Sequence, residues 1–400
     1  MHVIVVGAGL TGLQSALSLI EKGAEVTLVE ALRSPCQGAS FSCAGLLGDE
    51  TPALIAPEAG RLARLRAMKS SDDGLVYSSG TAFRYASFVS ALLQNRAPEK
   101  TEPRKALLAQ LAAASALLMN EQAERCGFEL QKSEGLLTRL TKEETAARPN
   151  ARLVSSDDIL RLEPSLYAAE DGGDYEIGNG VTWSVSYYAK QLREFLVNAG
   201  AKILSSRPVE SVIIENERAV GVQAGGELRA DAVLIAAGIG AQALLPEGAL
   251  GDTALAPITR SLLNVEVNAS ARRVRYAVRD TAGRVAAPLD AYLRLTGRWY
   301  LGTEEQCPTD DEYKALWAFG LRLFPEIADW SQGRYLSRTV LSTADGLPVA
   351  GATRISSLYV NVAGGMHGAD FASAAADAAS DAVLGRDNAF GPDLAFTRGI

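Results

Sequence analysis

The segment GAGLTG, residues 7–12, constrains the fold of this chain more than any other segment. It follows a short apolar run, Val3–Val6, and it opens an apolar stripe at helical spacing. Gly7, Gly9 and Gly12 have the spacing G-x-G-x-x-G. The first glycine allows a tight turn, the second lets the backbone approach a diphosphate, and the third lets the helix pack closely on a sheet. The pattern predicts a buried strand, a phosphate-binding turn and a helix.

A second predicted strand, Glu25–Val29, follows that helix and ends at Glu30. An acidic residue at this place accepts hydrogen bonds from a ribose 2′-hydroxyl and repels a 2′-phosphate. The unit therefore predicts an ADP-containing dinucleotide whose diphosphate lies at the positive end of the helix. NAD and FAD both satisfy the prediction at this stage. The expected contacts come from Gly7, Gly9, Leu10, Thr11, Gly12, Glu30 and Ala31.

Composition narrows the class of protein. The chain has 400 residues, 48% apolar and 22% charged, which predicts a globular protein with room for two structural units. A net charge of −8 without any Lys/Arg-rich block argues against a nucleic-acid partner. Four scattered cysteines without a CxxC pair favour a reducing compartment over disulfides or a metal site. No apolar run is long enough to span a bilayer, and the N-terminus lacks a signal-peptide pattern, so we expect a cytoplasmic protein.

The loop after Glu30 favours FAD over NAD. Residues 36–47, CQGASFSCAGLL, are small and punctuated by glycine, as if a flat group lies against the backbone. The segment resembles the corresponding loop of the D-amino-acid oxidase-like flavoprotein family, in which a serine and an Ala-Gly pair lie along the FAD. Ser40, Ala44 and Gly45 match that pattern. Within that family the segment resembles the small subunit of bacterial D-amino-acid dehydrogenase, which usually has asparagine where this chain has Cys43.

The resemblance extends through the middle and the end of the chain. It implies that the backbone near Val209 contacts the adenine end of the FAD, and that the Ala-Ala-Gly turn, with Ala237 and Gly238, lies near the dinucleotide. Near the C-terminus, STADGLPVAG matches the family's Asp-Gly-x-Pro strand, and a glycine loop follows it. This loop consists of Gly364, Gly365, Met366, His367 and Gly368.

The glycine loop leads into an alanine-rich predicted helix, residues 369–384, which ends at Gly385. Free backbone N–H groups and the positive end of the helix can stabilise negative charge on the N1/O2 edge of a reduced flavin. Glycines suit the loop because the backbone itself must approach the ring. We therefore expect the segment to act through its backbone, with the His367 side chain packed beside the loop rather than serving as a base.

The resemblance implies oxidative deamination of a D-amino acid to a 2-oxo acid, with hydride transfer to flavin N5. Such a reaction needs a group that orients the substrate carboxylate, and the planar fork of arginine suits it. The family places an arginine near the position of Val340, and Arg338 lies on the same face of that predicted strand, two residues away. Arg294 is the second candidate, because Tyr292, Arg294 and Thr296 alternate onto one face of a predicted strand that could form the floor of the pocket. Tyr292 and Tyr300 could offer hydroxyl groups to the substrate.

Three alternatives remain open for the activity. They stand beside the leading hypothesis, in which the enzyme passes the electrons to a quinone-like acceptor. In that hypothesis the protein contacts the cytoplasmic face of the inner membrane. An amino-acid oxidase that uses oxygen, acting on glycine or sarcosine, is a close alternative, as is a D-hydroxyproline-type imino acid dehydrogenase. A flavin-holding subunit without catalytic activity represents a different class. No cysteine follows Cys307, where relatives with a covalent flavin carry one, so dissociable FAD is expected.

The predicted fold is α/β. We expect a Rossmann-like FAD-binding domain with a parallel sheet, and an interleaved α+β substrate domain, as in glycine oxidase and D-amino-acid oxidase. The FAD-binding domain is assigned to residues 1–48, 150–250 and 338–400. The substrate domain is assigned to residues 49–149 and 251–337. The site should lie between the two, at the carboxyl ends of the parallel strands.

Overall fold

The computed structural model describes residues 1–43, 45–47, 75–95, 98–147, 152–167, 174–289, 291–307 and 309–398. One sheet, called here the parallel sheet, is assembled from segments far apart in the sequence. Its strands are β1 (His2–Val6), β2 (Glu25–Val29), β9 (Lys202–Leu204), β13 (Ala232–Ile235), β19 (Val349–Ala352) and β20 (Leu358–Val362). Their order is β19-β20-β13-β1-β2-β9, and each neighbouring pair is parallel except β19 with β20. The central place of β1 explains its apolar run, because both of its faces are covered.

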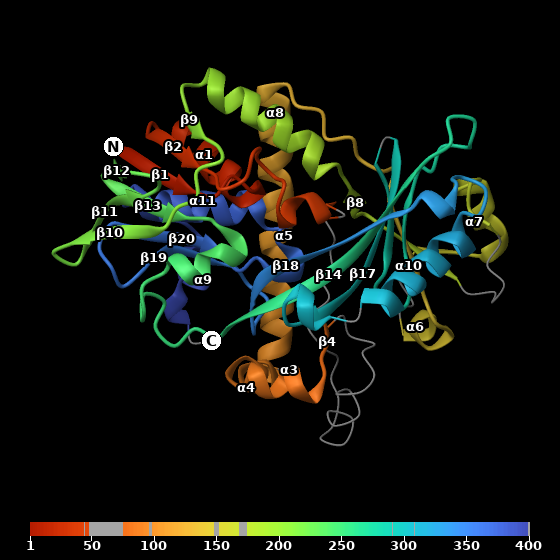
Figure 1. The fold of residues 1–400 in the computed structure, drawn as a ribbon. Helices are drawn as coiled ribbons and strands as arrows, with labels where there is room; N and C mark the ends of the chain where they lie inside the picture. The colour runs from red at the N-terminus through yellow and green to blue at the C-terminus, as the bar shows by residue number, and fades with distance from the viewer. Residues whose placement is uncertain are drawn as a thin grey trace.

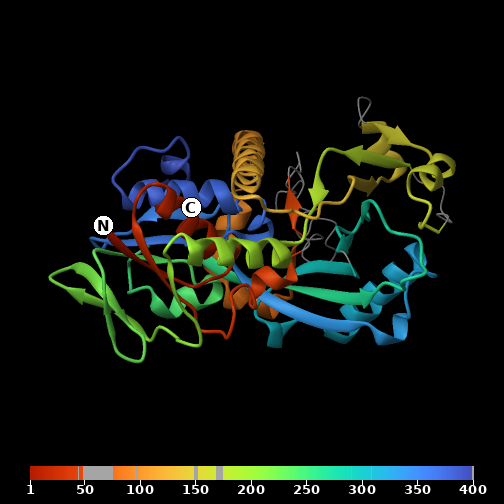
Figure 2. The same ribbon diagram turned by 90° about the horizontal axis from the view of Figure 1, so that it is seen from above.

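Helices cover one face of the parallel sheet. They are α1 (Leu10–Glu21), α5 (Pro98–Cys126), α8 (Val185–Asn198) and α11 (Ala372–Val383). Their apolar sides share one core with Val3 and Val5 of β1. Small residues on α11 allow it to pack closely on α1 and on the sheet. The long helix α5 packs against α11. It lies beside the place where the parallel sheet meets the second large sheet of the molecule (Figures 1 and 2).

A smaller layer covers the opposite face of the parallel sheet. It consists of β10 (Ser211–Glu215), β11 (Arg218–Gln223), β12 (Glu227–Arg229) and α9 (Ala241–Leu244). Ala219 and Val222 of this layer share a core with Ile4 and Val6. The alternation of side chains along β1 therefore supplies two separate cores, one on each face of the sheet.

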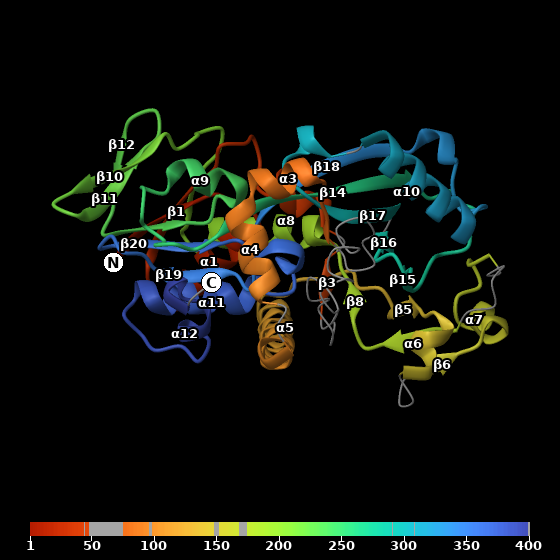
Figure 3. The same cartoon turned by 90° about the horizontal axis from the view of Figure 1, so that it is seen from below.

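A second large sheet, called here the mixed sheet, lies beside the first and contains long antiparallel strands (Figures 1 and 3). In spatial order its strands are β18 (Arg334–Thr343), β14 (Leu255–Glu266), β17 (Tyr292–Leu301), β16 (Val285–Leu289), β15 (Ala277–Arg279), β5 (Leu136–Arg139), β7 (Tyr175–Gly178) and β6 (Leu153–Val154). The short strand β4 (Leu75–Val76) pairs with β17. Helix α10 (Thr309–Leu323) packs on the face that carries Leu263 and Leu295. The other face of β14, β17 and β18 is thereby left to line the site.

The remaining elements are short. They are β3 (Leu46–Leu47), β8 (Val181–Thr182), α3 (Ser79–Arg84), α4 (Ala86–Gln94), α6 (Lys142–Ala147), α7 (Ser156–Leu162) and α12 (Gly391–Leu394), with the 3-10 turns η1 (Ala39–Ser42), η2 (Gly238–Gly240), η3 (Glu304–Gln306), η4 (Trp330–Gln332), η5 (Gly365–His367) and η6 (Phe396–Arg398). None of the helices in the described ranges has the length and apolar character that crossing a bilayer requires. The four cysteines are free thiols.

The α/β prediction, with a parallel sheet opening on a glycine turn, is confirmed by this arrangement. Two elements pack differently from the expected division of the chain, a pair of strands and a helix. β6 and β7, which the sequence grouped with the FAD-binding segments, pair with β5 in the mixed sheet. α5, which the sequence grouped with the substrate segments, packs on the helices of the parallel sheet. Both differences arise because partners distant in sequence, rather than local patterns, decide where an edge strand or a helix packs.

Candidate flavin and substrate site

The turn between β1 and α1 is a cradle that only glycine fits. Gly7 has φ +99°, and a Cβ atom there would lie 2.6 Å from the carbonyl oxygen of Ala236. A Cβ atom on Gly12 would lie 1.9 Å from the carbonyl oxygen of Gly7. The turn therefore brings β1, α1 and β13 into backbone contact and leaves the start of α1 open toward the site. The turn fits a diphosphate, because the positive end of α1 meets the space that the glycines leave open.

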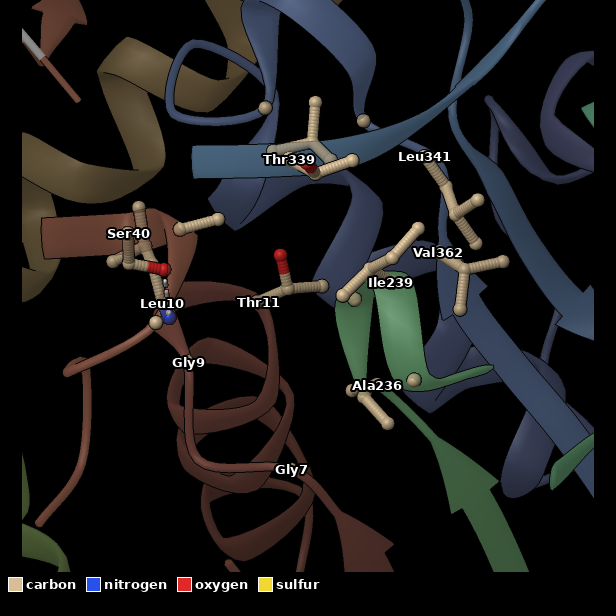
Figure 4. A pocket seen from close by; sticks show the side chains of 18 of the residues that line it. Gly7, Gly9, Leu10, Thr11, Ser40, Ala236, Ile239, Thr339, Leu341 and Val362 are labelled. Atoms are coloured by element: carbon tan, nitrogen blue, oxygen red, sulfur yellow. Dashed lines mark hydrogen bonds between the residues drawn. The ribbon is translucent and has the colours of Figure 1, made fainter. Parts of the chain in front are cut away.

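Two side chains hold the turn from outside. The Glu30 carboxylate, at the end of β2, accepts hydrogen bonds from the backbone N–H of Ala8 at 2.6 Å and of Leu32 at 2.8 Å. The Ser40 hydroxyl accepts one from the N–H of Leu10 at 3.0 Å (Figure 4). The Thr11 side chain points into the space between α1 and β18 in the same view. Glu30 and Ser40 thus fix the glycine turn and also line the space that a dinucleotide would enter.

A continuous cavity of about 870 Å³ extends from the glycine turn to the mixed sheet. Most residues expected to contact the cofactor line it. They are Gly7, Gly9, Leu10, Thr11, Glu30, Ala31, Ser40, Val209, Ala237, Gly238, Gly364, Gly365, Met366 and Gly368. Gly12 and Gly45 lie outside the lining and serve backbone packing, since a Cβ atom on Gly45 would lie 2.2 Å from the carbonyl oxygen of Trp183. Ala44 lies outside the described residues.

The C-terminal glycine loop closes the far end of the cavity. Ala363, at the end of β20, has φ +59°, a strained value for a residue with a side chain. A Cβ atom on Gly364 would lie 2.7 Å from the Cα of Gly368, so the loop is tightly folded on itself. His367 does not line the cavity, and its Nδ1 lies 3.1 Å from Oδ2 of Asp370. The loop therefore presents backbone rather than an imidazole to the site.

Arg294 has a role in the structure that the sequence did not suggest. Its guanidinium is buried and donates to the carbonyl oxygens of Phe41, at 2.5 Å, and Cys43, at 3.0 Å. Its Nε donates to Oδ1 of Asn264 at 2.9 Å. Burial lowers the pKa of Arg294 to about 10, below its usual range. Arg294 does not line the cavity, because its donors are bound to the loop that carries η1.

The two tyrosines suggested for the substrate also lie outside the cavity lining. The Tyr300 hydroxyl donates to the Glu312 carboxylate of α10, on the side of the mixed sheet away from the site. Burial, followed by the neighbouring Glu312 carboxylate, raises the pKa of Tyr300 above its ordinary value. Tyr292 stands at the start of β17 and is 46% exposed. Side chains therefore do not alternate regularly along β17, as a pocket floor would require. The pairing of β14 with β17 changes register between Arg260 and Leu262, which interrupts the alternation.

Arg338 lies where the sequence suggested, on β18 and in the cavity lining. Arg260 and Trp299, which the sequence analysis did not single out, line the same end. The Arg260 guanidinium carbon is 5.3 Å from the centre of the Trp299 ring, and its Nε donates to the carbonyl oxygen of Gly297 at 2.8 Å. An arginine amid the apolar residues of a long strand is the signal that could have found Arg260.

The fold and the site together define a dinucleotide-binding flavoprotein. One elongated cavity is lined by the glycine turn at the start of α1, by Glu30 at the end of β2 and by the glycine loop at the far end. The cavity reaches the face of the mixed sheet that carries Arg260 and Arg338. This combination suits an extended cofactor with a diphosphate at one end and a flat ring at the other.

Comparison with known proteins agrees. The family model DAO, FAD dependent oxidoreductase, matches residues 2–382. The chain belongs to this family, and its cofactor is FAD. The crystal structure of glycine oxidase from Geobacillus kaustophilus is similar to this chain, with a TM-score of 0.68 and 21% identity over 100% of this chain and 98% of that one. The L-proline dehydrogenase from P. horikoshii has a TM-score of 0.71 and 15% identity over 99% and 97% of the two chains. These similarities confirm the predicted glycine oxidase-like fold.

Proposed function

We propose that the protein oxidises a D-amino acid to a 2-oxo acid and passes the electrons to a quinone-like acceptor. The observation that carries the proposal is the position of Arg338, whose side chain shares one cavity with the glycine turn and the glycine loop. FAD supplies the hydride acceptor when it is bound. Side chains and backbone groups of this chain are proposed to bind the substrate, to orient it and to exclude water.

Arg338 is proposed to hold the substrate carboxylate through two parallel hydrogen bonds from its planar fork. Holding that carboxylate fixes the direction of the Cα–H bond, which converts a chance encounter into an oriented one. The N–H groups of the loop 364–368 and the positive end of α11 are proposed to stabilise the negative charge that develops at the far end of the cavity. No side-chain base is needed when the substrate amine binds in its neutral form.

The donor class is supported by structural neighbours. Proteins described as glycine oxidase, L-proline dehydrogenase and iminodiacetate oxidase share the fold with 15 to 21% identity. The choice of a D-amino acid and of a quinone-like acceptor rests on the loop resemblance around Ser40 and Gly45. We further propose a cytoplasmic location with peripheral contact to a membrane that holds the acceptor.

The proposed division of the chain keeps residues 1–48, 150–250 and 338–400 for FAD and residues 49–149 and 251–337 for the substrate, with two adjustments. Helix α5 is grouped with the FAD-binding part, because it shares the core of α1 and α11. Strands β6 and β7 are grouped with the substrate part, because they extend the mixed sheet.

The test is an anaerobic titration of the yellow holoprotein with D-amino acids, L-amino acids and cyclic amines. We expect D-amino acids to bleach the visible flavin absorbance and their L-enantiomers to leave it unchanged. Arg338→Gln should raise the substrate concentration needed for bleaching by roughly 10- to 100-fold, since hydrogen bonds to charged groups contribute about 1.5 to 3 kcal/mol. Arg334→Gln, an exposed arginine at the start of the same strand, is the matched control.

Other outcomes assign the alternatives. Fast peroxide production when oxygen is admitted would identify an oxidase, and slow reoxidation that a soluble quinone accelerates would identify a dehydrogenase. Bleaching by cyclic amines alone would identify an imino acid dehydrogenase. A yellow protein that no amine bleaches would overturn the proposal and point to a flavin-holding subunit.

A further inference from the structure

Arg260 of β14 and Arg338 of β18 stand directly opposite each other across the strand pair. Both side chains line the cavity. Two like charges opposite each other in an antiparallel pair destabilise the sheet. Neither arginine forms an ion pair with any carboxylate in the described part of the chain, including the four that line the same cavity, Glu30, Glu210, Glu304 and Glu305. Neither guanidinium charge is therefore neutralised by a carboxylate of the described residues within ion-pair distance, and an anionic ligand would compensate both.

The two guanidinium groups are anchored to different strands. Nε of Arg260 donates to the carbonyl oxygen of Gly297 in β17, and the group stacks over Trp299 of the same strand. Nη1 of Arg338 donates to the carbonyl oxygen of Ser337 in its own strand, β18, at 2.7 Å. Because β17 and β18 flank β14, the two anchoring strands are two strand spacings apart, about 10 Å. The two side chains are thus anchored apart and offer two separate forks.

We propose that the substrate is an amino dicarboxylate, with one carboxylate bound by Arg338 and the second by Arg260. This inference rests on the proposed function, since it names the substrate class of that same site. Each charge-assisted hydrogen bond spans about 2.8 Å, so the two bonds take up roughly half of the distance between the anchoring strands. The remainder accommodates a short carbon chain that bears the amine. Trp299 restrains the Arg260 guanidinium, which reduces the conformational freedom lost on binding.

Unreactive acids test the binding separately from the reaction. The holoprotein is titrated with succinate and glutarate, and with propionate and butyrate as matched monocarboxylates, while the shift in the visible flavin spectrum reports binding. We expect the better dicarboxylate to bind roughly 10- to 100-fold more tightly than its monocarboxylate, because one additional charged hydrogen-bonded pair forms. Under anaerobic conditions, D-aspartate or D-glutamate should bleach the flavin at a correspondingly lower concentration than D-alanine.

Three variants locate the second carboxylate. Arg260→Gln should abolish the advantage of succinate and leave the affinity for propionate unchanged. Arg260→Lys should retain part of the advantage, since it keeps the charge and loses the fork. Arg334→Gln should behave as the wild type. The FAD content of each purified variant reports whether it folds, and if Arg260→Gln fails to fold, the comparison of acids on the wild type and on Arg260→Lys still decides.

The outcomes separate this inference from the proposed function. If succinate and glutarate bind no more tightly than the monocarboxylates while D-alanine bleaches the flavin, the inference is overturned and the proposed function stands. If Arg260→Gln weakens propionate and succinate equally, both arginines grip one carboxylate, and the inference is overturned as well. If dicarboxylates bind tightly but no amine bleaches the flavin, the dicarboxylate site stands and the proposed function falls.

Discussion

The guanidinium of Arg294 donates hydrogen bonds to the main-chain carbonyl oxygens of Phe41 and Cys43, which lie 253 and 251 residues earlier in the chain. A side chain of the mixed sheet thereby fixes the loop that follows β2 of the parallel sheet. Arg294 is only 5% exposed, so the pair of hydrogen bonds is shielded from water. The contact makes the shape of the cavity beside η1 depend on a residue that does not line it.

We expect Arg294→Gln to weaken FAD binding by roughly 10- to 100-fold, because charged hydrogen bonds to carbonyl groups contribute about 1.5 to 3 kcal/mol. Arg294→Lys keeps the charge and loses the fork, so its affinity should be intermediate. Fluorescence titration of the apoprotein with FAD measures the dissociation constants. An Arg294→Gln protein that binds FAD as tightly as the wild type would show that the loop keeps its shape without these hydrogen bonds.

Gly12→Ala should abolish FAD binding or prevent folding, since the added methyl group would lie 1.9 Å from the carbonyl oxygen of Gly7. The conflict is with backbone, which no side-chain rearrangement relieves. Gly80→Ala is the control, because the nearest atom to its Cβ would be 3.8 Å away and alanine favours a helix by about 1 kcal/mol. Absorbance spectra and thermal unfolding of both proteins decide the point. A yellow Gly12→Ala protein with unchanged thermal stability would contradict the cradle geometry.

Tyr300→Phe should lower stability without changing substrate affinity. The hydroxyl of Tyr300 donates to the carboxylate of Glu312, which is 1% exposed and also accepts from the N–H of Arg298 at 3.0 Å. Loss of one donor to a buried carboxylate costs about 1 to 3 kcal/mol. Denaturant unfolding and substrate titration measure the two effects. Tyr292→Phe, on an exposed side chain, should change neither quantity. A weaker substrate affinity in Tyr300→Phe would return this hydroxyl to the substrate site.

Acid stability should depend on the buried ion pair between Arg398 and Asp345, whose Nε and Oδ2 atoms lie 2.9 Å apart. Burial by itself raises the pKa of Asp345, but hydrogen bonds and charge from Arg398 outweigh it, so the pKa is held below the ordinary 3.8. Because the folded-state pKa is the lower one, the contribution is complete above the ordinary value and is lost as pH falls through the folded value.

Asp345→Asn should therefore flatten the decline of unfolding free energy below about pH 4. At neutral pH the same variant should be less stable by about 3 to 5 kcal/mol, because it leaves the Arg398 charge buried and uncompensated. Urea unfolding between pH 3 and pH 7 measures both effects. An acid decline as steep in Asp345→Asn as in the wild type would assign acid sensitivity to other carboxylates.

FAD should leave the protein on denaturation. Burial raises the pKa of Cys36 to about 12 and also raises the pKa of Cys43, so both thiols that line the cavity stay protonated at neutral pH. A protonated thiol is a poor nucleophile toward the flavin ring. A yellow filtrate after heat denaturation and an unmodified protein mass are the expected results. A mass increase equal to one flavin would show covalent attachment.

Local patterns predicted the parts of this molecule that local contacts build. Gly7, Gly12 and Glu30 belong to one continuous βαβ unit, so their spacing already contains their geometry. The α/β fold and the cofactor could be predicted for the same reason, together with the family resemblance. The glycine loop before α11 is a further local unit, and its tight folding follows from Gly364 and Gly368.

The substrate end could not be predicted in this way, because its geometry depends on strand register. Arg260 faces Arg338 across a pairing that joins residues 78 positions apart, and one slip of register would turn either side chain to α10. Arg294 was assigned to the substrate from strand alternation, but the structure shows it bound to a loop that follows β2. Tyr300 was suggested for its hydroxyl group, which in the structure donates to Glu312. Alternation along a strand predicts which side chains share a face of the sheet. It does not predict which loop, helix or ligand contacts that face.

The central place of β1 has a consequence for biosynthesis. β1 is synthesised well before two of the strands to one side of it, since one of its neighbours, β13, begins at Ala232 and the next strand, β20, begins only at Leu358. Until β20 is made, the nascent chain carries an apolar strand whose edge is not yet paired, and such an edge promotes aggregation. We expect the newborn polypeptide to depend on chaperones until β20 has been made. Truncation before β20 should then give insoluble material rather than a smaller folded protein.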